Sequence, residues 1–260
     1  MKKILVISLA ALLLIDGGLF LARYLLKSEP AVSIVTQPPA SSAVTEPEKK
    51  LKELEGMQIC IDAGHGITEK KGQEPIAPQA SQTKPKHVSG AAGNQITEEE
   101  LNLQLAMQLD QALQEEGATV QMTRTAASCD LSNVERAKLG NQSQLVIRIH
   151  ADGNEDRDVN GISMLIPSGQ YISDTKLLSS SRTLGEAILS QVIASTGSKN
   201  RGIIERSDLT GFNWSEVPVV LLEAGFITNP EEEAKLVTPE YQQQLVQGIV
   251  NGIKEYIIQQ

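Results

Sequence analysis

This sequence has few aromatic residues and almost no cysteine. Phe, Trp and Tyr make up 3% of its 260 residues, so its core has to be built from aliphatic side chains, as is typical of layered α/β domains. Two cysteines cannot form a disulfide framework in a chain of this length. Cys60 stands between two isoleucines and is expected to be a small buried apolar group, with a bond between Cys60 and Cys129 as the alternative.

An excess of positive charge is also lacking. The chain has 23 Lys and Arg residues against 32 Asp and Glu residues, which gives a net charge of -9. This balance argues against a protein that binds nucleic acid by neutralising phosphates. It leaves open a polymeric glycan or a peptide as the substrate.

The clearest targeting signal lies at the N-terminus. Lys2 and Lys3 precede an apolar run over residues 4–15, which is typical of a secretory signal region. A small-x-small cleavage site is missing because Phe20 stands two residues before Ala22, so an uncleaved membrane anchor is favoured over a cleaved signal peptide. In either case we expect the folded body outside the cytoplasmic membrane, as a membrane-anchored or secreted protein.

Three segments are expected along the chain. Residues 1–27 form the signal peptide or signal anchor, and residues 28–55, rich in Pro, Ser, Thr and Glu, form a flexible linker. Residues 56–260 form the globular domain. Within this domain, residues 67–97 make a long polar loop, and loops of that length in a compact domain are usually functional or mobile.

Strand and helix patterns alternate over the globular domain, which predicts a single layered α/β domain with a largely parallel sheet. Thr97 and Glu100 have the spacing of a capping box at the start of the first helix, and the apolar stripe of that helix is expected to include Met107. Strands are expected near residues 57–62, 118–123, 145–150, 161–166, 202–204 and 218–222, and helices near residues 98–116, 133–139, 177–194 and 240–258.

Three of these strands end beside residues that bind metals or move protons, namely His65, His150 and Glu223. Because ligands bind beyond the carboxyl ends of strands in open α/β sheets, we expect these residues to converge. Two histidines and a glutamate are a known zinc ligand set. The carboxylate ligand is expected at the start of the first helix, at Glu98 with Glu100 as the alternative. Glu223 then remains as the general base.

Each of these residues also has a purely structural interpretation. A histidine at a strand end can bond a loop carbonyl, the glutamates can be the acidic first turn of a helix, and Glu223 can pair with a Lys or Arg. His87, in the polar loop, is expected to be exposed to solvent. Three further residues are candidates for substrate contact: Arg148, Asn213 and Trp214. For Arg148, which shares a strand face with His150, a structural salt bridge is the alternative.

Four sequence motifs surround these candidates: Ile61-Asp62-Ala63-Gly64-His65-Gly66, Glu98 followed by Asn102-Leu103, Arg148-Ile149-His150-Ala151-Asp152, and Leu222-Glu223-Ala224-Gly225-Phe226-Ile227-Thr228-Asn229-Pro230. Together they resemble the zinc-dependent N-acetylmuramoyl-L-alanine amidases of the amidase_3 type, over roughly residues 57–258. Two positions depart from the usual family pattern. Ala63 stands where proline is common, and Asp152 stands where asparagine is common, but neither change removes a proposed ligand.

The resemblance implies a six-stranded sheet flanked by helices, and it makes residues 56–260 a zinc amidase catalytic domain. It implies one zinc ion per chain, held by His65, Glu98 and His150, with Glu223 as the catalytic carboxylate. The implied substrate is peptidoglycan, cleaved at the amide between the lactyl group of N-acetylmuramic acid and L-alanine of the stem peptide. Cell-wall amidases can be autoinhibited by an extra helix, which makes the long polar loop a candidate gate.

Two other functions are compatible with the sequence. One is a non-catalytic or regulatory peptidoglycan-binding domain that keeps the fold without turnover, and the presence of all four proposed site residues counts against it. The other is a zinc peptidase that cuts within the stem peptide. The sequence indicates no protein partner.

Overall fold

The computed structural model describes residues 52–260. The expected signal or anchor segment therefore lies outside the described residues, as does nearly all of the expected linker. Within residues 52–260, no helix is long and apolar enough to cross a membrane. Leu54, two residues before the expected start of the globular domain, is fully buried, and its N–H donates to the carbonyl of Glu116 at 3.0 Å. The folded body thus begins before residue 56.

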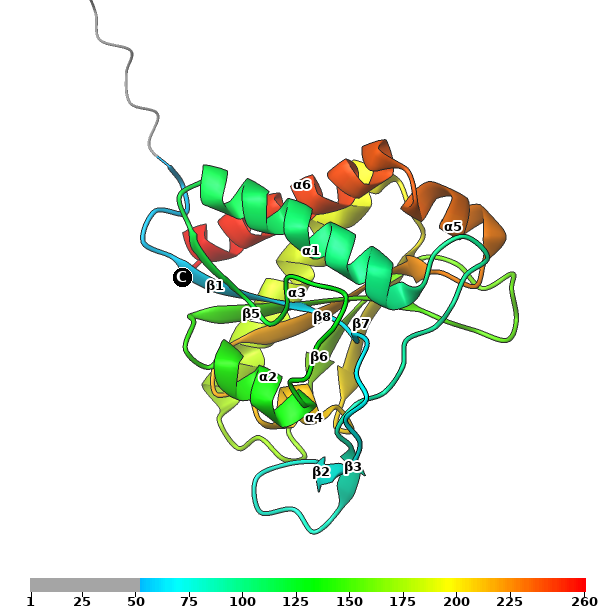
Figure 1. The fold of residues 1–260 in the computed structure, drawn as a ribbon. Helices are drawn as coiled ribbons and strands as arrows, with labels where there is room; N and C mark the ends of the chain where they lie inside the picture. Colours follow the sequence, from blue (N-terminus) through cyan, green and yellow to red (C-terminus); the bar gives the residue numbers. More distant parts are fainter. Residues whose placement is uncertain (1–51) are drawn as a thin grey trace, which may run out of the picture. The chain divides into compact units, whose positions relative to one another are not determined.

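A six-stranded sheet forms the centre of the domain, in the order β4–β1–β5–β8–β6–β7 (Figure 1). All neighbouring strands are parallel except β6 and β8. The prediction of a mostly parallel sheet flanked by helices is confirmed. The strands are β1 (Gln58–Ala63), β4 (Thr119–Met122), β5 (Leu145–Asp152), β6 (Ile162–Pro167), β7 (Asn200–Arg206) and β8 (Val219–Phe226).

Helices cover both faces of this sheet (Figure 1). One face packs against α1, α3 and α6, and the other against α2 and α4. The larger core lies on the first face and is aliphatic as expected, with Tyr256 as the one aromatic side chain among its buried described residues. The helices are α1 (Glu98–Glu115), α2 (Asn133–Gly140), α3 (Thr175–Thr196), α4 (Thr210–Asn213), α5 (Pro230–Leu236) and α6 (Pro239–Ile258).

Both cysteines are free and buried. Cys60 is fully buried in β1, within the smaller core on the second face of the sheet. Burial, together with the nearby charge of Asp62, raises the pKa of its thiol to about 12. Cys60 is therefore a small apolar packing group, as the sequence predicts.

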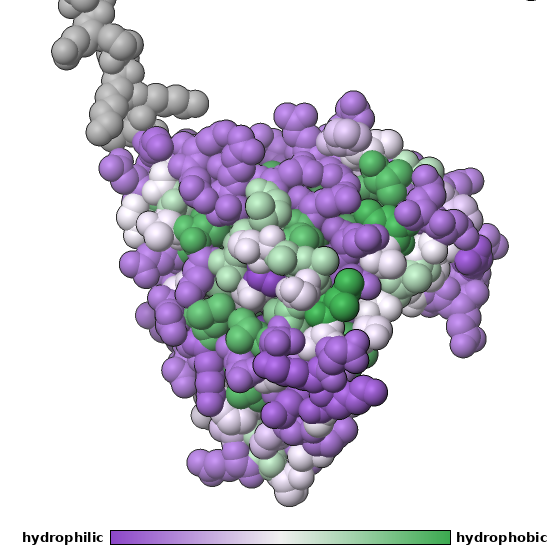
Figure 2. Space-filling view, in the orientation of Figure 1, coloured by the Kyte–Doolittle hydropathy of each residue, from purple (hydrophilic) through white to green (hydrophobic). Residues whose placement is uncertain are grey.

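The first long helix, α1, begins as expected. Thr97 is its N-cap residue, and its backbone N–H donates to Oε2 of Glu100 at 3.2 Å. The expected place of Met107 in the apolar stripe is wrong, since this residue is 44% exposed. Two residues beyond Leu105, the helix has turned by about 200°, which directs Met107 away from the sheet. The outward side of α1 is mainly hydrophilic (Figure 2).

Some elements differ from the expectation. The last strand, β8, continues to Phe226, so Glu223 lies inside it rather than after it. The long polar loop contains an antiparallel hairpin of β2 (Gln73–Pro75) and β3 (Thr83–Pro85). These strands have three residues each and no apolar alternation, so strand periodicity has nothing to detect in them. The short helices α4 and α5 are not predicted either, because four and seven residues are too few to show a helical period.

Helices α3 and α6 pack closely because glycines of α6 face α3. A Cβ atom added at Gly248 would lie 2.6 Å from Cα of Val192, and one added at Gly252 would overlap the backbone of Ile188. The two backbones therefore approach each other at these positions more closely than any larger side chain allows.

We predict that Gly252→Ala lowers the free energy of unfolding. Alanine in a helix normally stabilises by about 0.5–1 kcal/mol relative to glycine, but overpacking costs about 1–3 kcal/mol. The expected net loss is roughly 0.5–2 kcal/mol, measured by urea denaturation. Gln243→Ala, on the exposed side of the same helix, is the control and should change stability by less than about 0.5 kcal/mol. A Gly252→Ala variant as stable as the wild type would contradict the close contact.

Candidate metal centre and active-site cleft

Three candidate ligands come together at the carboxyl ends of β1 and β5. Nε2 of His65, which follows β1, lies 3.1 Å from Oε1 of Glu98, the first residue of α1. Nδ1 of His150, on β5, lies 3.0 Å from the same oxygen. The ligand atoms all lie within 4.8 Å of one another, and no other His, Cys, Asp or Glu cluster of this kind occurs in residues 52–260.

The two candidate carboxylates at the helix start lie in different places. Glu98 is 5% exposed and contacts both histidines. Glu100 is exposed, and its side chain accepts the backbone N–H of Thr97 instead. The structure therefore brings Glu98, and not Glu100, to the histidines.

The ring of His65 is held in one orientation. Its Nδ1 lies 2.7 Å from the carbonyl oxygen of Val88, which can only accept, so Nδ1 carries a proton and Nε2 is the nitrogen that faces Glu98. The backbone of His65 has a φ of 59°, in the left-handed region that few residues other than glycine adopt. Contacts with neighbouring residues must therefore hold the backbone of His65 in this unfavourable conformation.

The Glu98 carboxylate is surrounded by donors. Its Oε2 accepts the N–H of Ala91 at 2.8 Å, and its Oε1 accepts Nδ2 of Asn102 and the N–H of Ala151, each at 3.3 Å. Burial alone would raise the pKa of Glu98, but hydrogen bonds from His150 and His65 outweigh it and hold the pKa well below its usual range. Glu98 is therefore an anion at neutral pH, as a metal ligand has to be.

The two imidazoles differ in their electrostatics. Burial favours the neutral ring in both, and at His150 it exceeds the attraction of Glu98, so the pKa of His150 is lowered. At His65 the hydrogen bond and charge of Glu98 exceed the effect of burial, so its pKa is raised. His150 also has a buried Nε2 without a hydrogen-bond partner among the described residues. Two imidazoles and one carboxylate, with a buried ring nitrogen left unpaired, fit a zinc ion.

Glu223 lies beside these groups on β8, where its register partner on β5 is His150. Its Oε2 is buried and has no hydrogen-bond partner in the part of the chain that the structure describes. Burial, then the negative charges of Asp152 and Glu98, raise the pKa of Glu223 well above its usual value. A carboxyl group poised in this way is suited to proton transfer at near-neutral pH.

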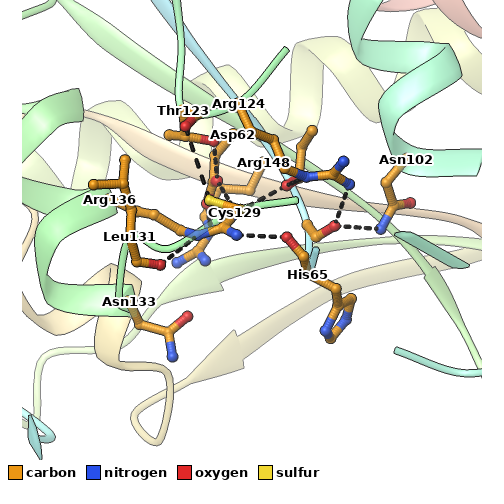
Figure 3. A network of polar contacts seen from close by, with 12 residues as sticks. Asp62, His65, Asn102, Thr123, Arg124, Cys129, Leu131, Asn133, Arg136 and Arg148 are labelled. Atoms are coloured by element: carbon orange, nitrogen blue, oxygen red, sulfur yellow. Dashed lines mark hydrogen bonds and ion pairs between the residues drawn. The ribbon is translucent and has the colours of Figure 1, made fainter. Parts of the chain in front are cut away.

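A buried ion cluster lies beneath the turn that carries His65 (Figure 3). The carboxylate of Asp62 lies 2.8 Å from Nη1 of Arg136 and 2.9 Å from Nε of Arg148, and it accepts Oγ1 of Thr123 at 2.7 Å. All three ionic side chains are less than 10% exposed. Burial alone would raise the pKa of Asp62, but the charges of Arg148 and Arg136 hold it far below its usual range.

Arg136 of this cluster and the neighbouring Arg124 fix the backbone of the turn that carries His65. Arg136 donates to the carbonyl oxygens of Ala63 and His65, and Arg124 donates to those of Ala63 and Gly64. Sequence reasoning missed Arg124 and Arg136 as site residues. The available signal was an aspartate at the end of an otherwise apolar strand, because a buried carboxylate requires cationic or hydrogen-bonding partners elsewhere in the chain.

A cleft of about 350 Å³ opens at this edge of the sheet. One wall is the segment from β3 to Val88, the other is the segment from the end of β7 to α4, and His65, Arg148, His150 and Glu223 also line it. His87 lines the cleft as well, although it was expected only to face solvent.

Asn213 and Trp214 are not among the lining residues of this cleft. Nδ2 of Asn213 donates to the carbonyls of Ile76 and Ser207, at 3.1 and 2.8 Å, and Nε1 of Trp214 donates to the carbonyl of Pro75 at 2.9 Å. Their polar groups hold the hairpin loop against α4. The structure therefore gives these two residues a structural contact outside the cleft, and their expected contact with substrate stays a prediction.

Comparison with known proteins agrees with this arrangement. The sequence profile of the Amidase_3 family, described as N-acetylmuramoyl-L-alanine amidase, matches residues 59–255. The chain belongs to this family. The predicted family, fold and enzyme class are confirmed: the domain is that of a peptidoglycan-hydrolysing N-acetylmuramoyl-L-alanine amidase.

The relatives are moderately similar. The protein YqiI of Bacillus subtilis is 32% identical over 204 residues, which cover 78% of this chain and 86% of YqiI. The N-acetylmuramoyl-L-alanine amidase LytC of the same species is 28% identical over 77% of this chain, but the match spans only 36% of LytC. The crystal structure of the N-acetylmuramyl-L-alanine amidase Ami1 from Mycobacterium smegmatis superposes with a TM-score of 0.72, at 26% identity, over 80% of this chain and 99% of Ami1.

We predict that Asp62→Asn costs about 3–5 kcal/mol of stability at pH 7, since it leaves two buried guanidinium groups without a counter-charge. Because the folded-state pKa of Asp62 is lowered, its contribution is complete above the unfolded pKa of about 3.9 and is lost as the pH falls below that value. Between about pH 4 and pH 2 the wild type should therefore lose stability more steeply than the variant, by up to about 1.4 kcal/mol per pH unit.

Urea denaturation at several pH values, with a chelator present, measures this difference. Glu155→Gln, at an exposed carboxylate, is the control and should change stability at pH 7 by less than about 0.5 kcal/mol. Equal pH slopes for the wild type and Asp62→Asn would show that Asp62 is not the coupled group.

Proposed function

We propose that this chain hydrolyses the amide between N-acetylmuramic acid and L-alanine of the stem peptide, at a zinc ion held by His65, Glu98 and His150. The observation that supports this proposal is the convergence of these three side chains, next to Glu223, at the carboxyl edge of the sheet. Three protein ligands are the usual number in catalytic zinc sites, which keep one position open. Membership of an amidase family identifies the bond.

In this mechanism Glu223 is the acid–base group. Zinc, when bound, would supply Lewis acidity that polarises an amide carbonyl and lowers the pKa of water. Glu223 takes a proton from the attacking water and delivers it to the leaving nitrogen of L-alanine. Its raised pKa favours both transfers, because the group can hold the proton between the two steps. The Val88 carbonyl keeps Nε2 of His65 free for the metal.

We also propose that the enzyme acts outside the cytoplasmic membrane, where its peptidoglycan substrate lies. The family supports an action on the cell wall. The basic and apolar N-terminal pattern supports residues 1–27 as a signal or membrane anchor.

Glu223→Gln should retain zinc and lose activity by at least about a hundredfold, because a general base contributes roughly 10²–10⁴ to the rate. Digestion of purified peptidoglycan followed by mass spectrometry measures the release of intact stem peptide. Zinc content of the same preparations shows that the metal centre is intact. Near-normal turnover by the variant would refute the role of Glu223. Cleavage within the stem by the wild type would indicate a peptidase instead, and absence of any product with zinc present would indicate a binding domain.

Substitution of the proposed ligands should lower zinc stoichiometry. We expect Glu98→Ala to lose most of the bound metal, since it removes the carboxylate shared by His65 and His150. Glu100→Ala is the matched control one half-turn away, because its side chain only caps α1. Emission spectrometry after dialysis against dilute zinc measures the zinc content of both variants. Equal zinc content in the two variants would rule out the assignment of Glu98.

A further inference from the structure

The cleft has a charge opposite to that of the whole chain. Five Lys or Arg side chains and two carboxylates line it, and when Asp62 is counted, which pairs with two of these cations, a surplus of two positive charges remains in a chain whose net charge is -9. Walls of low dielectric constant concentrate such a potential inside a cleft and favour an anionic ligand. The cations are Lys84, Lys86, Arg136, Arg148 and Arg206, and the carboxylates are Asp208 and Glu223.

Four of the five cations already form ion pairs within the protein. Asp208 accepts Nε and Nη2 of Arg206 at 2.7 and 2.9 Å, and its carboxylate lies 3.2 Å from Nζ of Lys84. This cluster joins the two walls of the cleft. Arg136 is bound by Asp62 and by backbone carbonyls beneath His65. Lys86 forms no ion pair with a described residue, and Arg148 is paired only through Nε, so these two cations can still meet a ligand.

Arg148 presents an open guanidinium edge to the cleft. Its Nε lies 2.9 Å from Oδ2 of Asp62 in an ion pair without hydrogen-bond geometry, and the guanidinium makes no hydrogen bond to any of residues 52–260. The side chain is 8% exposed and lies against Gly211, where an added Cβ atom would overlap the guanidinium. A fixed and largely desolvated guanidinium binds a carboxylate more strongly than an exposed one.

Lys86 brings a second positive charge from the opposite wall. Its backbone is held, because its N–H donates to Gly72 at 3.0 Å and its carbonyl accepts Nδ2 of Asn133 at 3.1 Å. Its ammonium group, in contrast, forms no ion pair with any described residue, and the side chain is exposed at the cleft. The backbone of Lys86 is therefore held beside the cleft, while its ammonium group remains free to bind a ligand.

We propose that the cleft selects stem peptides that carry a free carboxylate, which Arg148 and Lys86 bind, over stems in which that carboxylate is amidated. This proposal rests on the proposed amidase function and names a determinant of its substrate preference. The carboxylate and the scissile amide belong to one peptide, so binding of the former places the latter near Glu223 and the metal ligands, which line the same cleft.

The test uses two synthetic muropeptides that differ only by a free carboxylate or a primary carboxamide on the stem. For the zinc-loaded wild type, we expect a KM about two- to fivefold lower for the carboxylate, the size expected from a partly exposed charge pair. Lys86→Ala should raise KM for the carboxylate substrate by a similar factor, with kcat and the carboxamide substrate unaffected. Lys71→Ala, an exposed lysine outside the cleft, is the matched control and should preserve the preference. Arg148 is unsuitable as the test residue because it also neutralises Asp62.

Equal KM values for the two substrates in the wild type would overturn the proposal, as would equal effects of Lys86→Ala and Lys71→Ala. Competition by a polyglycerol phosphate but not by a free stem carboxylate would also overturn it, and would assign the charge to a phosphodiester polymer. Absence of turnover on both substrates would contradict the proposed function instead. Calorimetric titration of the same two muropeptides would then still test the carboxylate preference by itself.

Discussion

The ion cluster around Asp62 holds the end of β1, the start of α2 and the middle of β5 in one arrangement. Asp62 is 2% exposed, and two guanidinium groups share its charge. Such a cluster adds little net stability compared with apolar packing, but removal of one member leaves the others buried and uncompensated. Because Arg136 also binds the carbonyl of His65, the cluster sets the conformation of the residue that supplies the first candidate ligand. The candidate metal centre thus depends on charged side chains that contact the backbone of His65 and not the imidazole ring.

The residue pattern predicts the positions of the two histidines because each follows a short apolar run that can only be a buried strand. It narrows the carboxylate ligand to the start of α1 but does not decide between Glu98 and Glu100 by composition alone. The helix period decides it. Glu98 lies three and seven residues before Leu101 and Leu105 and so shares their buried face, whereas Glu100 lies about 200° further round the helix.

Other parts of the site could not be predicted, because they depend on contacts between distant segments. The polar groups of Asn213 and Trp214 bind carbonyls of Ile76 and Pro75, more than 130 residues earlier in the chain. Lys84 and Asp208 are separated by 124 residues. A polar residue near a strand end is compatible with substrate contact or with loop attachment, and only the identity of its partner distinguishes the two.

The long polar loop contributes to the candidate metal centre itself. The carbonyl of Val88 fixes the proton on His65, and the N–H of Ala91 binds Glu98, so two candidate ligands are oriented by this loop. A gate that moved the whole loop would break both hydrogen bonds and release the ligands together. Binding of the proposed metal would therefore be thermodynamically linked to folding of the loop, since each favours the state that the other requires. Any opening that preserves the metal centre has to be confined to the β2–β3 hairpin, where the bond between Lys84 and Asp208 closes one end of the cleft.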